Sequence, residues 1–123
     1  MAALHNDVFD NGLSSIDDNT ENLHILSGDP GLTWSNIATY KLGTKATPVI
    51  NEPSDRSAGG REIIIDAILD GLVSSTDTAT HFALTDDTEE KILVSGELAA
   101  SQAVTSGNAF TLTSFTVGIP DPA

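Results

Sequence analysis

One stretch of the chain, residues 78–98 with the sequence TATHFALTDDTEEKILVSGEL, limits the possible folds more than any other. Apolar and polar residues alternate up to the acidic run DDTEE, and the alternation returns after it. A period of two is typical of a half-buried strand, and two such runs around a short polar turn indicate an antiparallel hairpin. We expect Phe82, Leu84, Ile92 and Val94 in its core and a solvated acidic tip that discourages edge pairing.

Further strands are predicted in segments bounded by turn residues, namely LHILSG (23–28), REIIIDAIL (61–69) and AFTLTSFTVGI (109–119), and TPVIN (47–51) is expected to start an extended piece. Three consecutive isoleucines are β-branched and stiff, which favours a strand, and apolar residues on both of its faces predict a central position in the sheet. The last segment changes phase, which predicts a bulge near Ser114 or burial on both faces. The dipeptides DG (70–71) and GN (107–108) predict turns.

The N-terminal part of the chain follows a different pattern. Apolar residues recur at steps of three to five over residues 3–17, which predicts a helix. Residues 31–46 contain Trp34 and Tyr40, the single Trp and the single Tyr of the chain, and are expected to form a short helix or an irregular arm. This arm either packs across the sheet or presents an aromatic patch at a subunit contact, where such residues often anchor interfaces.

These patterns predict a mainly β fold, a small β-sandwich or barrel-like domain with an N-terminal helix and arm. A length of 123 residues suits a single domain. We expect the helix and arm to occupy residues 1–46 and the β core to occupy residues 47–123. Hydrophobic residues make up 39% of the chain, which is enough for a packed core.

The charge of the chain restricts its partners. Eighteen acidic residues against five basic ones give a net charge of −13, which repels nucleic acid and anionic membrane surfaces, so we expect neither as a partner. The absence of cysteine excludes disulfides, thiolate metal sites and cysteine nucleophiles. Without a signal-like start or a long apolar run, we expect a soluble protein made in a cytoplasm.

Basic residues are unevenly distributed along the chain. Lys41, Lys45, Arg56 and Arg61 lie in one short segment, and Lys91 is the only other basic residue. The segment 41–61 is either a set of solvated charges or a docking zone for an acidic neighbour, such as another copy of the protein.

No pattern of residues predicts catalysis. His5, His24 and His81 are far apart and in no metal-binding spacing, and His81 is expected to lie on a sheet face with a hydrogen-bond partner. The run DDNTEN (17–22) is similar to the start of a calcium loop but lacks its central glycine and closing glutamate. We therefore expect no catalytic residue, no bound metal and no cofactor, and the chain is not expected to be an enzyme.

Several segments, HNDVFDNGL, YKLG, DRSAGGREI, THFALTD and SGNAFTLTSFTVGIPDPA, resemble a family of short structural proteins encoded by tailed bacteriophages and prophages. The resemblance spans nearly the whole chain and implies a component of the virion. Small acidic β proteins of this length are similar to head decoration, or cement, proteins, which sit as trimers where major capsid subunits meet.

The resemblance implies a particle component made in the host cytoplasm, and the net charge of −13, which is ill-suited to the DNA-facing interior of a head, favours the outer capsid surface. On this hypothesis the partners are the major capsid protein and copies of the chain itself, as a homotrimer. The expected interface residues are Trp34, Tyr40, Lys41, Lys45, Arg56 and Arg61. A neck or tail component, such as a connector, tail or fibre-attachment protein, is the alternative. A carbohydrate-binding β-sandwich is less favoured, because aromatic residues make up only 5% of the chain and are scattered.

Overall fold

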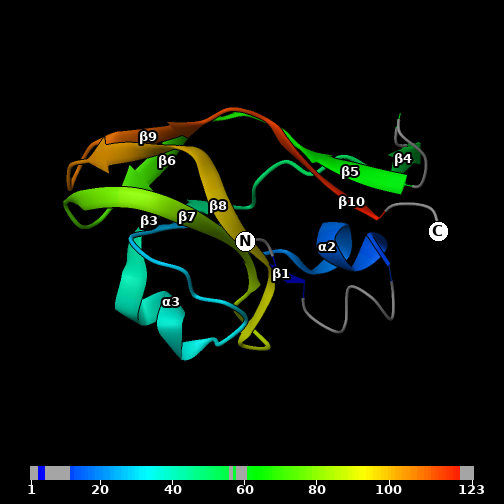
Figure 1. Ribbon diagram of the computed structural model, residues 1–123, viewed down its shortest axis with the longest axis horizontal. Helices are drawn as coiled ribbons and strands as arrows, with labels where there is room; N and C mark the ends of the chain where they lie inside the picture. Colours follow the sequence, from blue (N-terminus) through cyan, green and yellow to red (C-terminus); the bar gives the residue numbers. More distant parts are fainter. Residues whose placement is uncertain (1–2, 5–11, 56, 58–60, 120–123) are drawn as a thin grey trace.

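A computed structural model describes residues 3–4, 12–55, 57 and 61–119. These residues form a mainly β fold with two antiparallel sheets, the larger of which curls into a half-barrel (Figure 1). Two short helices accompany them, α2 (Ser14–Asn19) and α3 (Ser35–Tyr40). In spatial order, the larger sheet contains β1 (Ala3–Leu4), β8 (Lys91–Val104), β7 (Asp77–Asp86), β2 (Asn22–Leu26), β3 (Lys41–Ala46), β6 (Ile68–Val73) and β9 (Ala109–Leu112). The smaller sheet contains, in the same way, β10 (Phe115–Ile119), β5 (Arg61–Ile65) and β4 (Ser54–Asp55).

The predicted hairpin is confirmed by β7 and β8, which pair from Asp86 opposite Lys91 at the acidic tip. Leu84, Ile92 and Val94 are buried as expected. Phe82 is only half-buried and packs against the edge of the core. The pairing slips farther along, because Ala79 faces Gln102 whereas His81 faces Glu97, so residues 98–101 of β8 form a wide bulge.

Two predicted strands each divide between the two sheets. REIIIDAIL becomes β5 and β6, and AFTLTSFTVGI becomes β9 and β10. Ile65 pairs with Phe115 in the smaller sheet and Ile68 pairs with Leu112 in the larger one, so a single antiparallel ribbon bends from one sheet into the other. The phase change near Ser114 is therefore a corner between sheets, a common place for strands to bend.

The segment between β3 and β4 holds this corner in place. The Asp66 backbone N–H donates to the carbonyl of Val49, and Asn51 Nδ2 donates to Asp66 Oδ1 at 2.7 Å. The turn predicted at residues 70–71 is wrong, because both residues lie inside β6. The turn at 107–108 is confirmed, with Gly107 at a φ of 90° that suits glycine.

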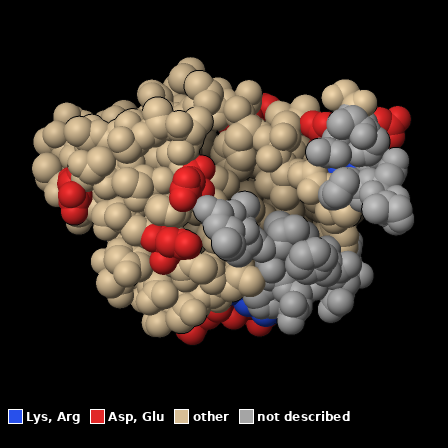
Figure 2. Space-filling model, viewed as in Figure 1, with Lys and Arg blue, Asp and Glu red and all other residues tan. Residues whose placement is uncertain are grey.

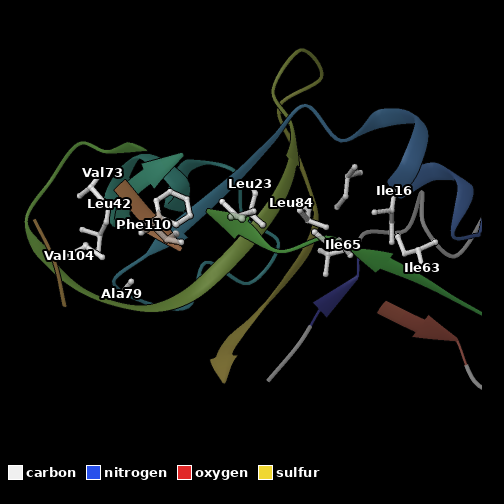
Figure 3. Close-up of a cluster of buried hydrophobic side chains, with 14 of the residues drawn as sticks. Ile16, Leu23, Leu42, Ile63, Ile65, Val73, Ala79, Leu84, Val104 and Phe110 are labelled. Carbon is white, nitrogen blue, oxygen red and sulfur yellow. The ribbon is translucent and has the colours of Figure 1, made fainter. Parts of the chain in front are cut away.

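The main core lies on the inner face of the larger sheet and extends to the smaller sheet and α2 (Figure 3). Leu23 and Leu84 come from the larger sheet, Ile63 and Ile65 from the smaller sheet and Ile16 from α2, all with no measurable exposure. Both sheets and α2 therefore contribute to one continuous cluster.

A second, smaller cluster lies on the outer face of the larger sheet, beneath α3. Its buried members are Leu26, Ile37, Ala83 and Ile92. The two clusters explain why β2 and β7 carry buried side chains on both faces: each strand is covered on two sides.

The first 46 residues differ from the prediction. The expected helix over residues 3–17 is wrong, because Ala3 and Leu4 pair with β8 and the helix that forms covers Ser14–Asn19. Residues 5–11 of the predicted helix lie outside the described residues. The expected arm contributes α3 and also β3, which lies between β2 and β6 in the middle of the larger sheet. The expected boundary at residue 46 therefore separates segments that share one sheet.

Candidate functional site

The two predicted aromatic anchors flank α3. Trp34 precedes the helix and Tyr40 ends it, and both are half-buried against the outer-face cluster. The Tyr40 ring also lies over Gly28, where a Cβ atom would come within 2.9 Å of it. These contacts support the interpretation of residues 31–46 as a segment that packs across the sheet, since both rings fasten α3 to it.

The predicted basic residues do not form one patch. Lys45 on β3 pairs with Asp70 on β6, at 3.1 Å between Nζ and Oδ1. Arg61, on β5 in the smaller sheet, pairs with Asp55 at 2.7 Å and donates to the carbonyl of Pro53. The remaining two basic residues of the segment are the exposed Lys41, at the start of β3, and Arg56, which lies outside the described residues. The segment 41–61 is therefore divided between two sheets, with two of its charges locally neutralised.

His24 occupies the most unusual polar environment that the structure describes. It lies on β2 facing the outer side of the sheet, is 4% exposed, and its Nδ1 is 2.8 Å from Thr44 Oγ1. Its Nε2 is buried without a hydrogen-bond partner among the described residues and lies 3.7 Å from Asp87 Oδ1. Burial lowers the pKa of His24 below its ordinary value and Lys41 adds to this, while Asp87 opposes it.

A cavity of about 160 Å³ adjoins His24 and is lined by Trp34, Ser35, Lys41 and Asp87 among others. Catalysis by a histidine base needs a nucleophile within hydrogen-bond reach of the ring and facing a substrate. The hydroxyl within reach, that of Thr44, does not line the cavity, and the Ser35 hydroxyl that does line it is not hydrogen-bonded to the ring. The arrangement therefore lacks the geometry of a nucleophile with its base.

The other polar residues singled out in the sequence have structural contacts. His81 lies on β7 with its Nδ1 2.8 Å from Thr80 Oγ1, which confirms the prediction of a sheet-face histidine with a partner. The acidic hairpin tip docks on Glu21, whose carboxylate accepts hydrogen bonds from the backbone N–H and the hydroxyl of Thr88. These bonds hold the pKa of Glu21 below its ordinary value. Within the described part of the chain, no group of three or more His, Cys, Asp or Glu side chains could hold a metal ion.

A third feature is a stretch of surface without charged side chains. Residues 98–119 contain no Asp, Glu, Lys or Arg, although the rest of the chain is highly charged. They form the second half of β8, then β9 and β10, and most of their side chains are exposed or half-exposed. The part of the surface over β9 is free of charged residues in Figure 2. We refer to residues 98–119 as the uncharged face.

Exposed leucines extend this face. Leu69 and Leu72 lie on β6, beside β9, with 74% and 63% of their surfaces exposed. They point away from the core, because their neighbours Ile68 and Gly71 are buried on the inner side. The sequence patterns considered above did not predict this face. The unbroken run of uncharged residues 98–119 in an acidic chain is the signal that could have predicted it.

Comparison of the chain with protein-family models, with curated proteins and with solved structures finds no match. Neither described helix is long and apolar enough to cross a membrane, and no other helix among the described residues is.

Proposed function

We propose that this chain is a structural protein of a tailed-phage virion, and most simply a head decoration protein that binds the outer surface of the capsid. The observation that carries the proposal is the uncharged face on a strongly acidic body. The resemblance of the sequence to phage structural proteins suggests that the chain belongs to a virion. The uncharged face is the surface through which it would contact another virion protein.

An uncharged face suits contact with another protein. Burying a charged group without a partner costs free energy, and the buried centres of protein interfaces are depleted in charged residues. Residues 98–119 avoid this cost, and exposed Leu69 and Leu72 add apolar area beside them. A monomer in solution gains nothing from exposing two leucines on one strand, whereas a subunit of an assembly gains their burial.

The charge of the remaining surface supports an outer position. A net charge of −13 would be repelled by packaged DNA, so a place inside the head is disfavoured. Outside the head, the same charge keeps free copies soluble and apart.

A contact through the uncharged face differs from the one expected at residues 41–61. Trp34 and Tyr40 are already used in fastening α3 to the sheet, and Lys45 and Arg61 have acidic partners within the chain. We propose that the uncharged face, rather than the basic segment, carries most of the contact with the capsid.

Copy number on purified particles tests the position. Heads and tails are separated from particles that carry the protein, and densitometry gives the copies per head. We expect hundreds of copies on the head. A dozen or fewer copies, confined to the neck or tail, would support a connector, tail or fibre-attachment protein instead, and absence from particles would refute both.

A charge-placement pair tests the face itself. Ala109 is exposed on β9, so Ala109→Glu adds a charge to the uncharged face, while Thr39→Glu adds the same charge on the exposed side of α3. Heads lacking the protein are incubated with each variant and sedimented. We expect Ala109→Glu to lose binding by at least about tenfold, since burying an unpaired charge is costly, and Thr39→Glu to bind like the wild type. Equal binding by the two variants would refute a role for the face.

A further inference from the structure

His24 has a ring nitrogen whose partner the described part of the chain does not supply. The side chain is 4% exposed, and its Nε2 is buried without a hydrogen bond to any described residue. The other nitrogen, Nδ1, is 2.8 Å from Thr44 Oγ1 on β3. With the ring proton on Nδ1 and donated to Thr44, Nε2 carries a lone pair, which is the form in which imidazole binds a metal ion.

The spacing between His24 and Asp87 fits a bridging metal ion better than a direct or a water-mediated contact. Asp87 Oδ1 lies 3.7 Å from His24 Nε2. A direct N–H···O hydrogen bond measures about 2.7–3.2 Å, and two groups bridged by one water with bonds of about 2.8 Å lie about 4.6 Å apart. A tetrahedral zinc ion, with bonds of about 2.0–2.2 Å to nitrogen and oxygen, holds its ligands about 3.3–3.5 Å apart. Because the Asp87 side chain is 38% exposed, a small movement of its carboxylate closes the remaining difference.

Both side chains are oriented by threonines on the neighbouring strands. Thr44 on β3 fixes the His24 ring through Nδ1, and the buried Thr85 on β7 donates from Oγ1 to Asp87 Oδ1. Hydrogen bonds of this kind, made to metal ligands from behind, orient the ligands and raise their basicity. The pair therefore has the outer support that a metal site needs.

We propose that His24 Nε2 and Asp87 Oδ1 bind a zinc ion, with water in its remaining positions. Imidazole together with carboxylate suits Zn²⁺, whereas Ca²⁺ and Mg²⁺ prefer oxygen ligands alone. Both residues line the cavity of about 160 Å³, which has room for water ligands at about 30 Å³ each, and Ser35 lines it too. The half-exposed carboxylate gives the ion a route from solvent.

The site differs from a structural or catalytic zinc centre in its number of protein ligands. Such centres have three or four, whereas this pair offers two, so the bound ion should exchange readily. Two ligands from distant segments form no spacing motif, and the sequence patterns accordingly predicted no metal. The zinc site is also independent of the proposed function, because it lies beneath α3 and not on the uncharged face.

Lys41 opposes the ion and provides a test in the opposite direction. It lines the same cavity, and its positive charge acts on His24. Lys41 is exposed, so its flexible side chain keeps the ammonium group in water and weakens binding without filling the site. Removing this charge should strengthen zinc binding, which no loss of folding would do.

The bound ion would connect the hairpin tip to β2, because Asp87 follows β7 and His24 lies on β2. Only the folded chain brings the two together, so zinc should raise the midpoint of thermal unfolding. This shift is a second readout of the same site.

Isothermal titration of the untagged full chain with Zn²⁺, at about pH 7.5 where imidazole is neutral, measures the affinity. The ligand variants are His24→Gln and Asp87→Asn. Their matched controls are His81→Gln, a histidine on the same sheet, and Asp86→Asn, which removes the same charge from the same hairpin tip. Circular dichroism checks that each variant is folded.

The wild type and both controls should bind one zinc ion per chain with the same affinity, and the ion should raise their unfolding midpoints. Loss of an outer-shell partner costs about 10–100-fold in affinity, so Thr44→Val should bind about tenfold more weakly and each ligand variant at least as weakly. Lys41→Gln should bind about threefold more tightly or better.

Three results would overturn the site. The first is a wild type without saturable zinc binding. The second is equal binding by Asp87→Asn and Asp86→Asn, or by His24→Gln and His81→Gln. The third is displacement of zinc by excess Ca²⁺, which would show an adventitious ion only, held by the carboxylates of an acidic chain.

Discussion

Gly71 provides the most direct test of the register between β6 and β9. It pairs with Phe110, whose ring is 1% exposed and lies over it on the inner face. A Cβ atom at position 71 would be 2.2 Å from both Cε2 and Cζ of that ring. Carbon atoms in contact are normally about 3.5–4.0 Å apart, so the ring would have to move by more than about 1 Å.

The ring has little room to move. Phe110 Cδ2 is also 3.2 Å from the position that a Cβ atom on Gly43 would take, so a second backbone lies close to the ring. Overpacking of a core costs about 1–3 kcal/mol, and complete loss of a buried Phe side chain costs about 3–5 kcal/mol. We therefore expect Gly71→Ala to lower the free energy of unfolding by about 2–4 kcal/mol, a large share of the stability of a small domain.

Urea denaturation, followed by circular dichroism and by Trp34 fluorescence, measures this loss. Gly28→Ala is the matched comparison, because its Cβ also meets a ring, that of Tyr40, but at 2.9 Å and at the half-exposed surface. It should cost less than about 1 kcal/mol, since a half-exposed ring has room on its solvent side to turn aside.

A double-mutant cycle with Phe110→Leu isolates the contact. Leucine lacks the two ring atoms that a Cβ at position 71 would meet first, so Gly71→Ala should cost less than half as much in that background. The coupling should exceed about 1 kcal/mol, as expected for residues in contact. An equal cost in both backgrounds, or no cost in the wild type, would refute the proposed packing of Phe110 over Gly71.

Two further predictions concern the hairpin and His24. Leu84→Ala should lower the free energy of unfolding by about 2–5 kcal/mol, because Leu84 is fully buried. Phe82→Ala should lower it by only about 1–2 kcal/mol, because Phe82 is half-exposed. Equal losses of unfolding free energy in urea denaturation would contradict these burials. The pKa of His24 is lower in the folded state than in the unfolded chain, so the unfolded chain takes up a proton first as the pH falls. The wild type should therefore lose stability relative to His24→Gln as the pH falls through about 6.5. Parallel stability curves for the two proteins between about pH 8 and 5 would show that His24 does not titrate in this way.

Local patterns predicted the hairpin well. The two strands around the acidic tip alternate with a period of two, and their pairing needs only a short turn between neighbouring segments. The core positions Leu84, Ile92 and Val94 followed from this alternation. Phe82 did not, because its half-exposed ring packs against Phe115 of β10, which comes from a different part of the chain.

Patterns failed where two segments had to be placed relative to each other. REIIIDAIL contains no glycine or proline that would end a strand at Asp66. The strand ends there because the ribbon that this segment forms with residues 109–119 bends from one sheet into the other between Ile65 and Ile68. The helix predicted over residues 3–17 had a plausible period, but Ala3 and Leu4 instead extend the edge of β8. Tertiary pairing thus outweighed a local helical preference.

The candidate surfaces were only partly predictable. The sequence displayed the run without charge over residues 98–119, yet Leu69 and Leu72 lie beside it only because β6 pairs with β9. His24 and Asp87 are far apart in the chain and approach only because β2 pairs with β7. The basic segment looked continuous in sequence, but the structure divides it between two sheets.

The sequence by itself determined the mainly β character, the hairpin with its acidic tip, most of the apolar positions of the core and the strong negative charge. These follow from composition and from alternation within single segments, where the periodicity of a strand acts over a few residues. Only the tertiary structure decided which strands share a sheet, that β2 and β3 lie in its centre, where His24 is buried, and that the exposed leucines of β6 lie beside the uncharged face. Those features depend on pairing between distant segments, whose stability comes from contacts that no single segment contains.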